Sequence, residues 1–241
     1  MNKFKIFSLA FLASVSFGNA QDIAQVKKAI DAEQYENAKS MLKSILKTSP
    51  INGRANFMLG NVYLIQTETD SAKIAYQKGL AGTDGARLNY IGLGVIDLDN
   101  GDAVAAEANF ALALKDTKKK DVEELIAIGR AYTYSTKPNF KKAIEVLNKA
   151  KAINPNDANV QLALGDAYDR DKNQNDAYVA YRNAFQIDPT LLRAKMQLGV
   201  LLKGAKSYDE AIKSFNEVIA INPSYGPVYR ELAETYYKWG R

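Results

Sequence analysis

Residues 158–191, ANVQLALGDAYDRDKNQNDAYVAYRNAFQIDPTL, predict two amphipathic helices joined by a short polar turn. In the first half, Leu164 and Tyr168 stand four residues apart, a spacing that places both on one face of a helix. Ala177 and Tyr181 repeat this spacing in the second half. A single hairpin cannot bury its own apolar face, so the pattern predicts further copies stacked beside it.

Such copies recur along the chain at intervals of 34 to 37 residues. A small residue marks the first helix of each copy at Gly60, Gly94, Gly129, Gly165, Gly199 and Ala233. An alanine marks the second helix at Ala38, Ala72, Ala106, Ala143, Ala177 and Ala211. A large apolar residue follows four positions later at Leu42, Tyr76, Phe110, Leu147, Tyr181 and Phe215. Because proline interrupts helices, we expect four second helices to end near Pro50, Pro155, Pro189 and Pro223.

This pattern resembles the tetratricopeptide repeat family, whose unit of about 34 residues carries Leu-Gly-x-x-Tyr, then an alanine, an aromatic residue and a closing proline. The resemblance covers residues 21–241 and implies an all-α fold, a right-handed superhelix of stacked helical hairpins. We place the repeats near 21–52, 53–86, 87–121, 122–157, 158–191 and 192–225, with a partial repeat at 226–241. Two extra residues between Tyr132 and Ala143 predict a longer turn around Pro138.

Residues 1–20 have the layout of a cleavable signal peptide. Lys3 and Lys5 precede a mostly apolar run over residues 6–17, which is shorter than the ~20 residues that a membrane-spanning helix needs. We therefore expect cleavage after Ala20 and a periplasmic or secreted protein. Since the chain contains no cysteine, we expect neither disulfides nor a lipoprotein anchor.

Composition argues against catalysis. Histidine and cysteine are both absent, which removes the most frequent general base and the most frequent zinc ligands. The acidic residues Asp166, Asp169 and Asp171 lack the glycine and the spacing of a calcium loop, and so indicate the polar side of a helix. We predict a protein that is not an enzyme and that needs no metal or cofactor.

Charge gives no sign of nucleic-acid binding. The net charge is +5, and two of these charges belong to the lysines of the leader. The run Lys118–Lys120 is flanked by Asp116 and Asp121 and lacks interleaved aromatic residues, which favours a solvated loop. We expect no nucleic-acid partner, and no membrane span once the leader is removed.

The family resemblance implies a concave surface lined by the first helices, where an extended peptide or a partner's helix binds. The inward positions lie three residues before, one after and four after each marker residue. From these positions we predict partner contacts at Phe57, Asn61, Leu64, Ile91, Val95, Leu98, Ile126, Arg130, Leu162, Asp166, Asp169, Met196, Lys203 and Arg230. The set is apolar in the second and third repeats and mixed with charge later, which suits a polypeptide with a hydrophobic anchor.

These positions also allow two other interpretations. Phe57, Ile91 and Ile126 could pack against neighbouring helices, because apolar stripes usually belong to the core. Some relatives clamp an acidic C-terminus with lysine and asparagine; Asn61 matches the asparagine, but Phe57 replaces the lysine. We therefore expect no such clamp.

The function predicted from sequence is a scaffold that holds a protein partner in the cell envelope. One alternative is that the chain is the repeat region of a larger enzyme or signalling protein, because no second helix follows the last first helix before Arg241. A third possibility is self-association through this end, where Tyr236 and Trp239 would meet another chain.

Overall fold

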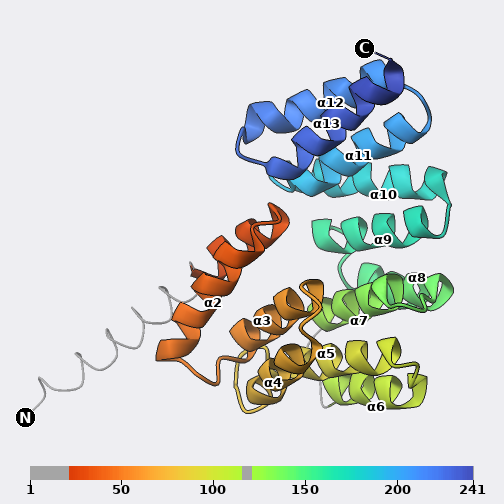
Figure 1. The fold of residues 1–241 in the computed structure, drawn as a ribbon. Coiled ribbons are helices and arrows are strands. Elements are labelled where there is room, and N and C mark those ends of the chain that lie inside the picture. The colour runs from red at the N-terminus through yellow and green to blue at the C-terminus, as the bar shows by residue number, and fades with distance from the viewer. Residues whose placement is uncertain (1–21, 116–120, 241) are drawn as a thin grey trace, which may run out of the picture. The chain divides into compact units, whose positions relative to one another are not determined.

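The computed structural model describes residues 22–115 and 121–240, and within these ranges every regular element is a helix. The predicted leader and the lysine run 118–120 lie outside the described residues. After a helical segment over residues 22–31 come α2 (Tyr35–Thr48), α3 (Gly53–Ile65), α4 (Thr69–Gly79), α5 (Ala86–Asp99), α6 (Ala103–Leu114), α7 (Val122–Tyr134), α8 (Phe140–Ile153), α9 (Ala158–Arg170), α10 (Gln174–Ile187), α11 (Leu192–Gly204), α12 (Tyr208–Ile221) and α13 (Gly226–Trp239) (Figure 1). The all-α prediction is confirmed. No described helix is both long enough and apolar enough to cross a membrane.

The chain divides into two compact units, Met1–Gly92 and Leu93–Arg241, with the boundary inside α5. In the first unit, α2 packs on α3, and α3 pairs with α4. In the second unit, α7 pairs with α8, α9 with α10, and α11 with α12 (Figure 1). Each of these hairpins packs on the next one along the chain, and α13 packs on α12. This unit is therefore a stack of helical hairpins.

Short polar side chains begin several helices by accepting a hydrogen bond from a free backbone N–H of the first turn. Asp157 bonds Val160 N–H at α9, and Asn173 bonds Asp176 N–H at α10. Four prolines mark the ends of α2, α8, α10 and α12. Each helix stops two residues before Pro50, Pro155, Pro189 or Pro223, as the sequence predicted.

The turns inside most hairpins are three residues long, and the middle residue has a left-handed backbone. This residue is Thr67 between α3 and α4, with φ 62°, and Gly101 between α5 and α6, with φ 84°. The hairpin of α7 and α8 instead uses the longer turn 135–139, which contains Pro138. The predicted enlargement of this turn is confirmed.

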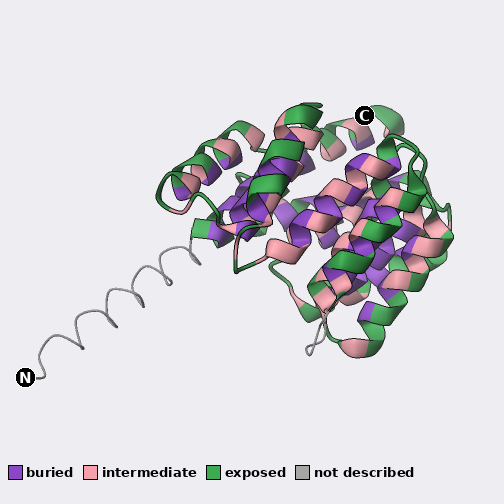
Figure 2. Cartoon of the chain, turned by 90° about the horizontal axis from the view of Figure 1, so that it is seen from below, coloured by how far each residue is buried: buried purple, intermediate pink, exposed green. Residues whose placement is uncertain are grey.

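Each marker glycine lies directly against the large apolar residue of the same hairpin. A Cβ atom added at Gly165 would stand 2.5 Å from ring carbons of Tyr181. The other pairs are Gly60 with Tyr76, Gly94 with Phe110, Gly129 with Leu147 and Gly199 with Phe215. These large side chains are buried, and Figure 2 shows burial running along the packed faces of the helices. The two sequence columns therefore form one contact that recurs in successive hairpins.

Candidate partner-binding site

In the first unit, the predicted contact residues differ in how far a partner could reach them. Ile91 is buried, whereas Phe57, Asn61 and Leu64 are half-buried. The Phe57 ring lies 6.1 Å from the ring of Tyr76, centroid to centroid, and Asn61 Oδ1 accepts a hydrogen bond from the Tyr76 hydroxyl at 2.7 Å. The half-buried residues keep a reachable surface, and their role in binding stays a prediction.

In the second unit, most of the predicted apolar contacts are part of the core. Buried there are Leu98, Ile126, Leu162, Asp166, Met196 and Lys203; half-buried are Val95, Arg130 and Asp169; and Arg230 is exposed. The buried side chains hold the helices together, so a partner would reach mainly the half-buried and exposed ones. These assignments too remain predictions.

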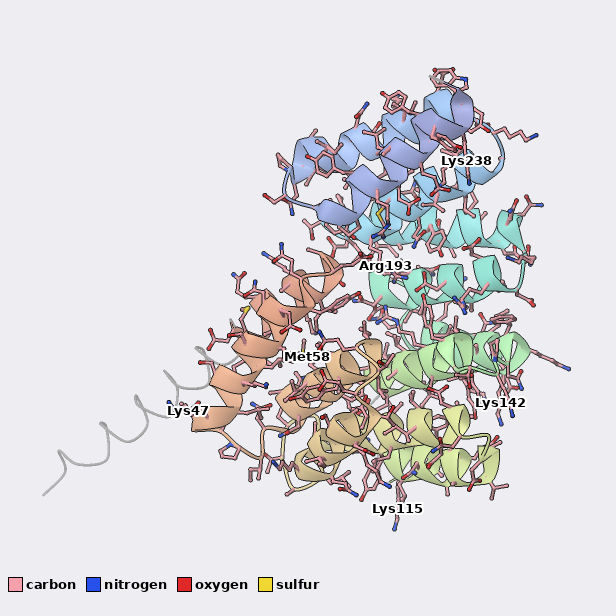
Figure 3. All side chains as sticks on the ribbon, in the orientation of Figure 1. Lys47, Met58, Lys115, Lys142, Arg193 and Lys238 are labelled. Carbon is pink, nitrogen blue, oxygen red and sulfur yellow. The ribbon has the colours of Figure 1, made fainter. Side chains whose placement is uncertain are left out.

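Asp166 on α9 is the centre of a polar cluster in the second unit. It is only 3% exposed, and its Oδ1 accepts hydrogen bonds from the Tyr181 hydroxyl and from Arg193 Nη2, both at 3.0 Å. Arg193, labelled in Figure 3, belongs to the first turn of α11. A buried carboxylate is costly unless it is paired, and here an arginine from the next hairpin pairs with it.

The cluster continues to α7 through Tyr134. Arg193 Nη2 also donates to the Tyr134 hydroxyl at 3.0 Å. The guanidinium of Arg170, at the end of α9, lies 5.0 Å from the centroid of the Tyr134 ring, within the range of a cation–π contact. The charge of Arg130, four residues earlier on α7, also acts on the Tyr134 hydroxyl. We call Arg130, Tyr134, Asp166, Arg170 and Arg193 the Tyr134 cluster. It joins three successive first helices, α7, α9 and α11.

Protonation in the Tyr134 cluster follows from burial and from the Asp166 carboxylate. Burial of the hydroxyl groups, reinforced by this carboxylate, raises the pKa of Tyr134 to about 12 and raises the pKa of Tyr181, although the Tyr134 side chain as a whole is 46% exposed. Burial opposes the charge of Arg193, but pairing with Asp166 outweighs it and raises the pKa of Arg193. Burial also raises the pKa of Asp169. At neutral pH the tyrosines are therefore hydrogen-bonding hydroxyls, and Arg193 is a cation.

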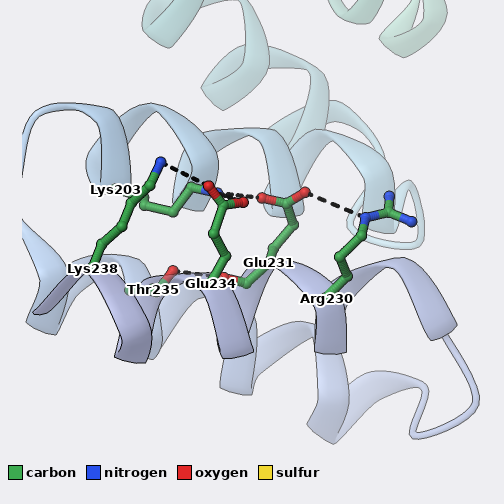
Figure 4. Close-up of polar contacts among 6 residues, drawn as sticks. All are labelled: Lys203, Arg230, Glu231, Glu234, Thr235 and Lys238. Atoms are coloured by element: carbon green, nitrogen blue, oxygen red, sulfur yellow. Dashed lines mark hydrogen bonds and ion pairs between the residues drawn. The ribbon is translucent and has the colours of Figure 1, made fainter. Parts of the chain in front are cut away.

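A second charged group lies between α11 and α13. Lys203 Nζ stands 2.7 Å from Glu231 Oε2 and 2.7 Å from Glu234 Oε2, and Lys238 Nζ stands 2.7 Å from Glu234 Oε1 (Figure 4). Thr235 donates its hydroxyl to the Glu231 carbonyl in the same helix (Figure 4). The buried Lys203 is thus engaged in ion pairs that join α13 to α11.

Sequence reasoning missed three members of the Tyr134 cluster. Tyr134 and Arg170 share one register position, five residues after Gly129 and Gly165, and Arg193 stands three residues before the predicted contact Met196. The inward face of each first helix extends by one position at either end, and these added positions hold Tyr134, Arg170 and Arg193. The signal was present, because i and i+3 residues share a helical face.

Comparison with known proteins agrees with this architecture. Two sequence profiles described as tetratricopeptide repeat match the chain, one at residues 23–87 and the other at residues 127–157 and 192–225. Yeast Tom70 has a similar solved structure, with a TM-score of 0.61, 17% identity, and coverage of 83% of this chain and 42% of that chain. The predicted fold class, a superhelical solenoid of this kind, is confirmed.

Two curated relatives show how far the sequence similarity extends. A TPR repeat-containing protein of Methanocaldococcus jannaschii is 23% identical over 209 residues, which are 83% of this chain and 37% of the relative. A peroxisomal targeting signal receptor of Eremothecium gossypii is 28% identical over 116 residues, which are 45% of this chain and 20% of the receptor. The chain thus spans well under two thirds of the length of these relatives.

Proposed function

Because the chain belongs to the tetratricopeptide repeat family, we propose that it is a non-catalytic scaffold that holds a peptide or a partner's helix against its first helices. Repeats of this kind typically serve protein–protein interaction. The name of one relative, a targeting signal receptor, describes recognition of a polypeptide signal by that protein. The Tyr134 cluster is the observation that carries the proposal for this chain.

The Tyr134 cluster has the features of a recognition surface. It gathers side chains from α7, α9 and α11 at positions that vary between repeats, whereas the glycine contacts recur unchanged. Tyr134 is 46% exposed, and its ring and hydroxyl are held by Arg170 and Arg193. A large aromatic side chain fixed by neighbours is a good anchor for a partner, because little side-chain entropy is lost on binding.

The proposed place of action is the cell envelope or the exterior. The support is the order of charged, apolar and small residues in 1–20. Cell fractionation and N-terminal sequencing of the mature protein would test it. We expect a chain that begins at Gln21 in the exported fraction, and an intact leader in the cytoplasm would contradict the proposal.

Site-specific photo-cross-linking tests the scaffold function with a matched pair of tyrosines. Tyr134 on α7 is 46% exposed and Tyr178 on α10 is 40% exposed, so they offer similar surfaces on a first and a second helix. Each is replaced in turn by benzoylphenylalanine, and the full chain is irradiated in cells that express it. We expect a discrete cross-linked polypeptide from position 134 and none from position 178.

Two outcomes of the cross-linking experiment would contradict the proposed function. Cross-links that form equally at both positions would indicate nonspecific contact, and cross-links only at position 178 would place the partner on the second helices. Either result would contradict binding to the first helices. Circular dichroism of both variants checks that the helices remain folded.

A further inference from the structure

The outer side of the second helix α6 is apolar and open to solvent. Val104 is 83% exposed and Leu112 is 44% exposed, and Ala108 and Ala111 between them are exposed as well. Because these residues follow one another at helical spacing, they form a single stripe along α6. We call Val104, Ala108, Ala111 and Leu112 the α6 stripe.

The repeat register shows that the α6 stripe is unusual in this chain. Its members stand two residues before and two, five and six residues after the marker alanine of the second helix. The same positions hold Glu36, Ser40, Lys43 and Ser44 on α2; Asp70, Ile74, Gln77 and Lys78 on α4; Lys141, Glu145, Asn148 and Lys149 on α8; Asn175, Val179, Arg182 and Asn183 on α10; and Asp209, Lys213, Asn216 and Glu217 on α12. All but Ile74 and Val179 are polar. Only α6 is apolar at all four positions, and a continuous exposed apolar surface marks a site of contact.

The surface beside the α6 stripe is also apolar. A groove of about 240 Å³ lies between α6, α7 and α8 and is lined by the buried side chains of Phe110, Ile128 and Tyr132. Glu107, at the edge of this groove, is engaged in an ion pair with Lys142 of α8. The charged side chain nearest to the stripe is therefore neutralised within its own chain.

We propose that α6 pairs with α6 of a second copy of this chain, in antiparallel orientation about a twofold axis at Ala108. A contact between identical surfaces must be self-complementary. In this register Val104 of each copy packs against Leu112 of the other, and the small side chain of Ala108 at the centre lets the two helices approach closely.

The charges at the ends of α6 favour the antiparallel orientation. Asp102 caps the N-terminus of the helix, and Lys115 follows its C-terminus. An antiparallel pair places Lys115 of one copy near Asp102 of the other, whereas a parallel pair would bring like charges together. The helix dipoles oppose each other in the antiparallel pair and add to the preference.

The composition of the α6 stripe fits a second helix better than a lipid surface. A helix that lies on a membrane usually presents large apolar side chains flanked by lysine or arginine. Here the centre of the stripe is alanine, and one end carries Asp102. The contact uses a second helix, so it does not rest on the proposed binding of a partner to the first helices.

Sedimentation velocity of the protein purified from cells that express the full chain tests this pairing. One helix from each copy forms a small interface, so we expect a monomer that converts to a dimer between about 1 µM and about 1 mM. Ala108→Glu places two like charges against each other at the twofold axis, and we expect it to raise the dissociation constant more than about tenfold.

A matched variant separates this effect from a general gain of negative charge. Val179 occupies the register position of Ala108 on α10 and is 44% exposed. Val179→Glu should leave the dissociation constant unchanged. Circular dichroism of both variants checks that the helices remain folded.

Chemical cross-linking tests the orientation. The chain has no cysteine, so Val104→Cys and Leu112→Cys each introduce a single thiol. In the antiparallel pair, position 104 of one copy lies level with position 112 of the other, and the two copies of position 104 are offset by about 12 Å along the helix axis. A short bismaleimide should therefore link the two variants when they are mixed, and link each variant to itself much less.

Three outcomes would overturn the inference. The first is a monomer at every concentration up to about 1 mM. The second is equal weakening by Ala108→Glu and Val179→Glu, or cross-links that form as well in the separate variants as in the mixture. The third is a monomer that binds phosphatidylglycerol vesicles and loses this binding with Ala108→Glu, because the α6 stripe would then contact lipid.

Discussion

The second and fifth repeats make the same contact in different electrostatic settings. In the second repeat, the Tyr76 hydroxyl donates to the neutral Asn61 at 2.7 Å; in the fifth, the Tyr181 hydroxyl donates to the charged Asp166 at 3.0 Å. Asp166 also binds Arg193 and so ties α9 to α11. The glycine contact therefore sets the geometry of the hairpin, and the residue after the glycine sets the polarity around the tyrosine hydroxyl.

Substitution of the marker glycine should lower the free energy of unfolding more than any other change in these hairpins. Gly165→Ala would push a methyl group to 2.5 Å from the Tyr181 ring, so we expect a loss of about 2 kcal/mol in the free energy of unfolding. Gly204→Ala is the control, because a Cβ there meets nothing within 4 Å, and alanine should stabilise α11 by up to about 1 kcal/mol. Urea denaturation followed by circular dichroism measures both, and equal effects would refute the close contact.

The two tyrosine hydroxyls should differ in what their removal costs. We expect Tyr181→Phe to lower the free energy of unfolding by about 2 kcal/mol, because the buried Asp166 carboxylate loses a donor. Tyr76→Phe should cost about 1 kcal/mol, since Asn61 is neutral and half-buried. Denaturant titration of the two variants compares them. A larger loss for Tyr76→Phe would contradict the distinction between the repeats.

The hairpin turns offer a comparison that does not involve the core. Thr67 holds a left-handed φ of 62°, where a β-branched residue is strained, so Thr67→Gly should raise the free energy of unfolding by about 1 kcal/mol. Gly101→Ala at the equivalent turn should lower it by a similar amount. Thermal melting checks the opposite signs, and two changes of the same sign would be inconsistent with a shared turn geometry.

Acid should weaken the ion pairs of α13 by a small amount. Hydrogen bonds from Lys203 and Lys238 lower the pKa of Glu234 from its usual value of 4.5 to about 2. Because the folded-state pKa is depressed, the stabilisation is present above pH 4.5 and is lost as pH falls toward 2. Glu234 is largely solvent-facing, so screening by water keeps the effect small.

The pH dependence is checked with Glu234→Gln. The difference in stability between the wild-type chain and this variant should shrink as pH falls from 5 to about 2. Thermal melts across this range measure it. A constant difference would show that Glu234 does not keep its depressed pKa.

Much of the fold could be predicted from sequence, because the glycine, alanine and large apolar columns report packing inside a hairpin. The two extra residues between Tyr132 and Ala143, around Pro138, likewise predicted the long turn between α7 and α8. Burial along the first helices was harder to predict. Leu162 and Phe57 occupy the same register position, yet Leu162 is buried and Phe57 is half-buried, because neighbouring helices cover that position to different extents.

The repeat register can place the members of the Tyr134 cluster on one face of the first helices, but it does not predict which of them pair. Asp166 and Arg130 were included, but their different states depend on partners from other helices. Tyr181 and Arg193 both bind Oδ1 of Asp166, whereas the buried Nε of Arg130 has no hydrogen-bond partner among the described residues. Such cross-helix pairing depends on three-dimensional placement, which a periodic pattern does not supply.

Thiol protection tests the central claim, that a partner binds to the first helices, most directly. The chain has no cysteine, so Tyr134→Cys and Tyr178→Cys each introduce a single reactive thiol, on α7 and α10. Maleimide labelling rates are measured with and without the strongest binder from a library of random peptides, at peptide concentrations at which fluorescence anisotropy shows each variant to be bound. We predict slower labelling at position 134 and an unchanged rate at position 178. An unchanged rate at position 134, or protection only at position 178, would contradict it.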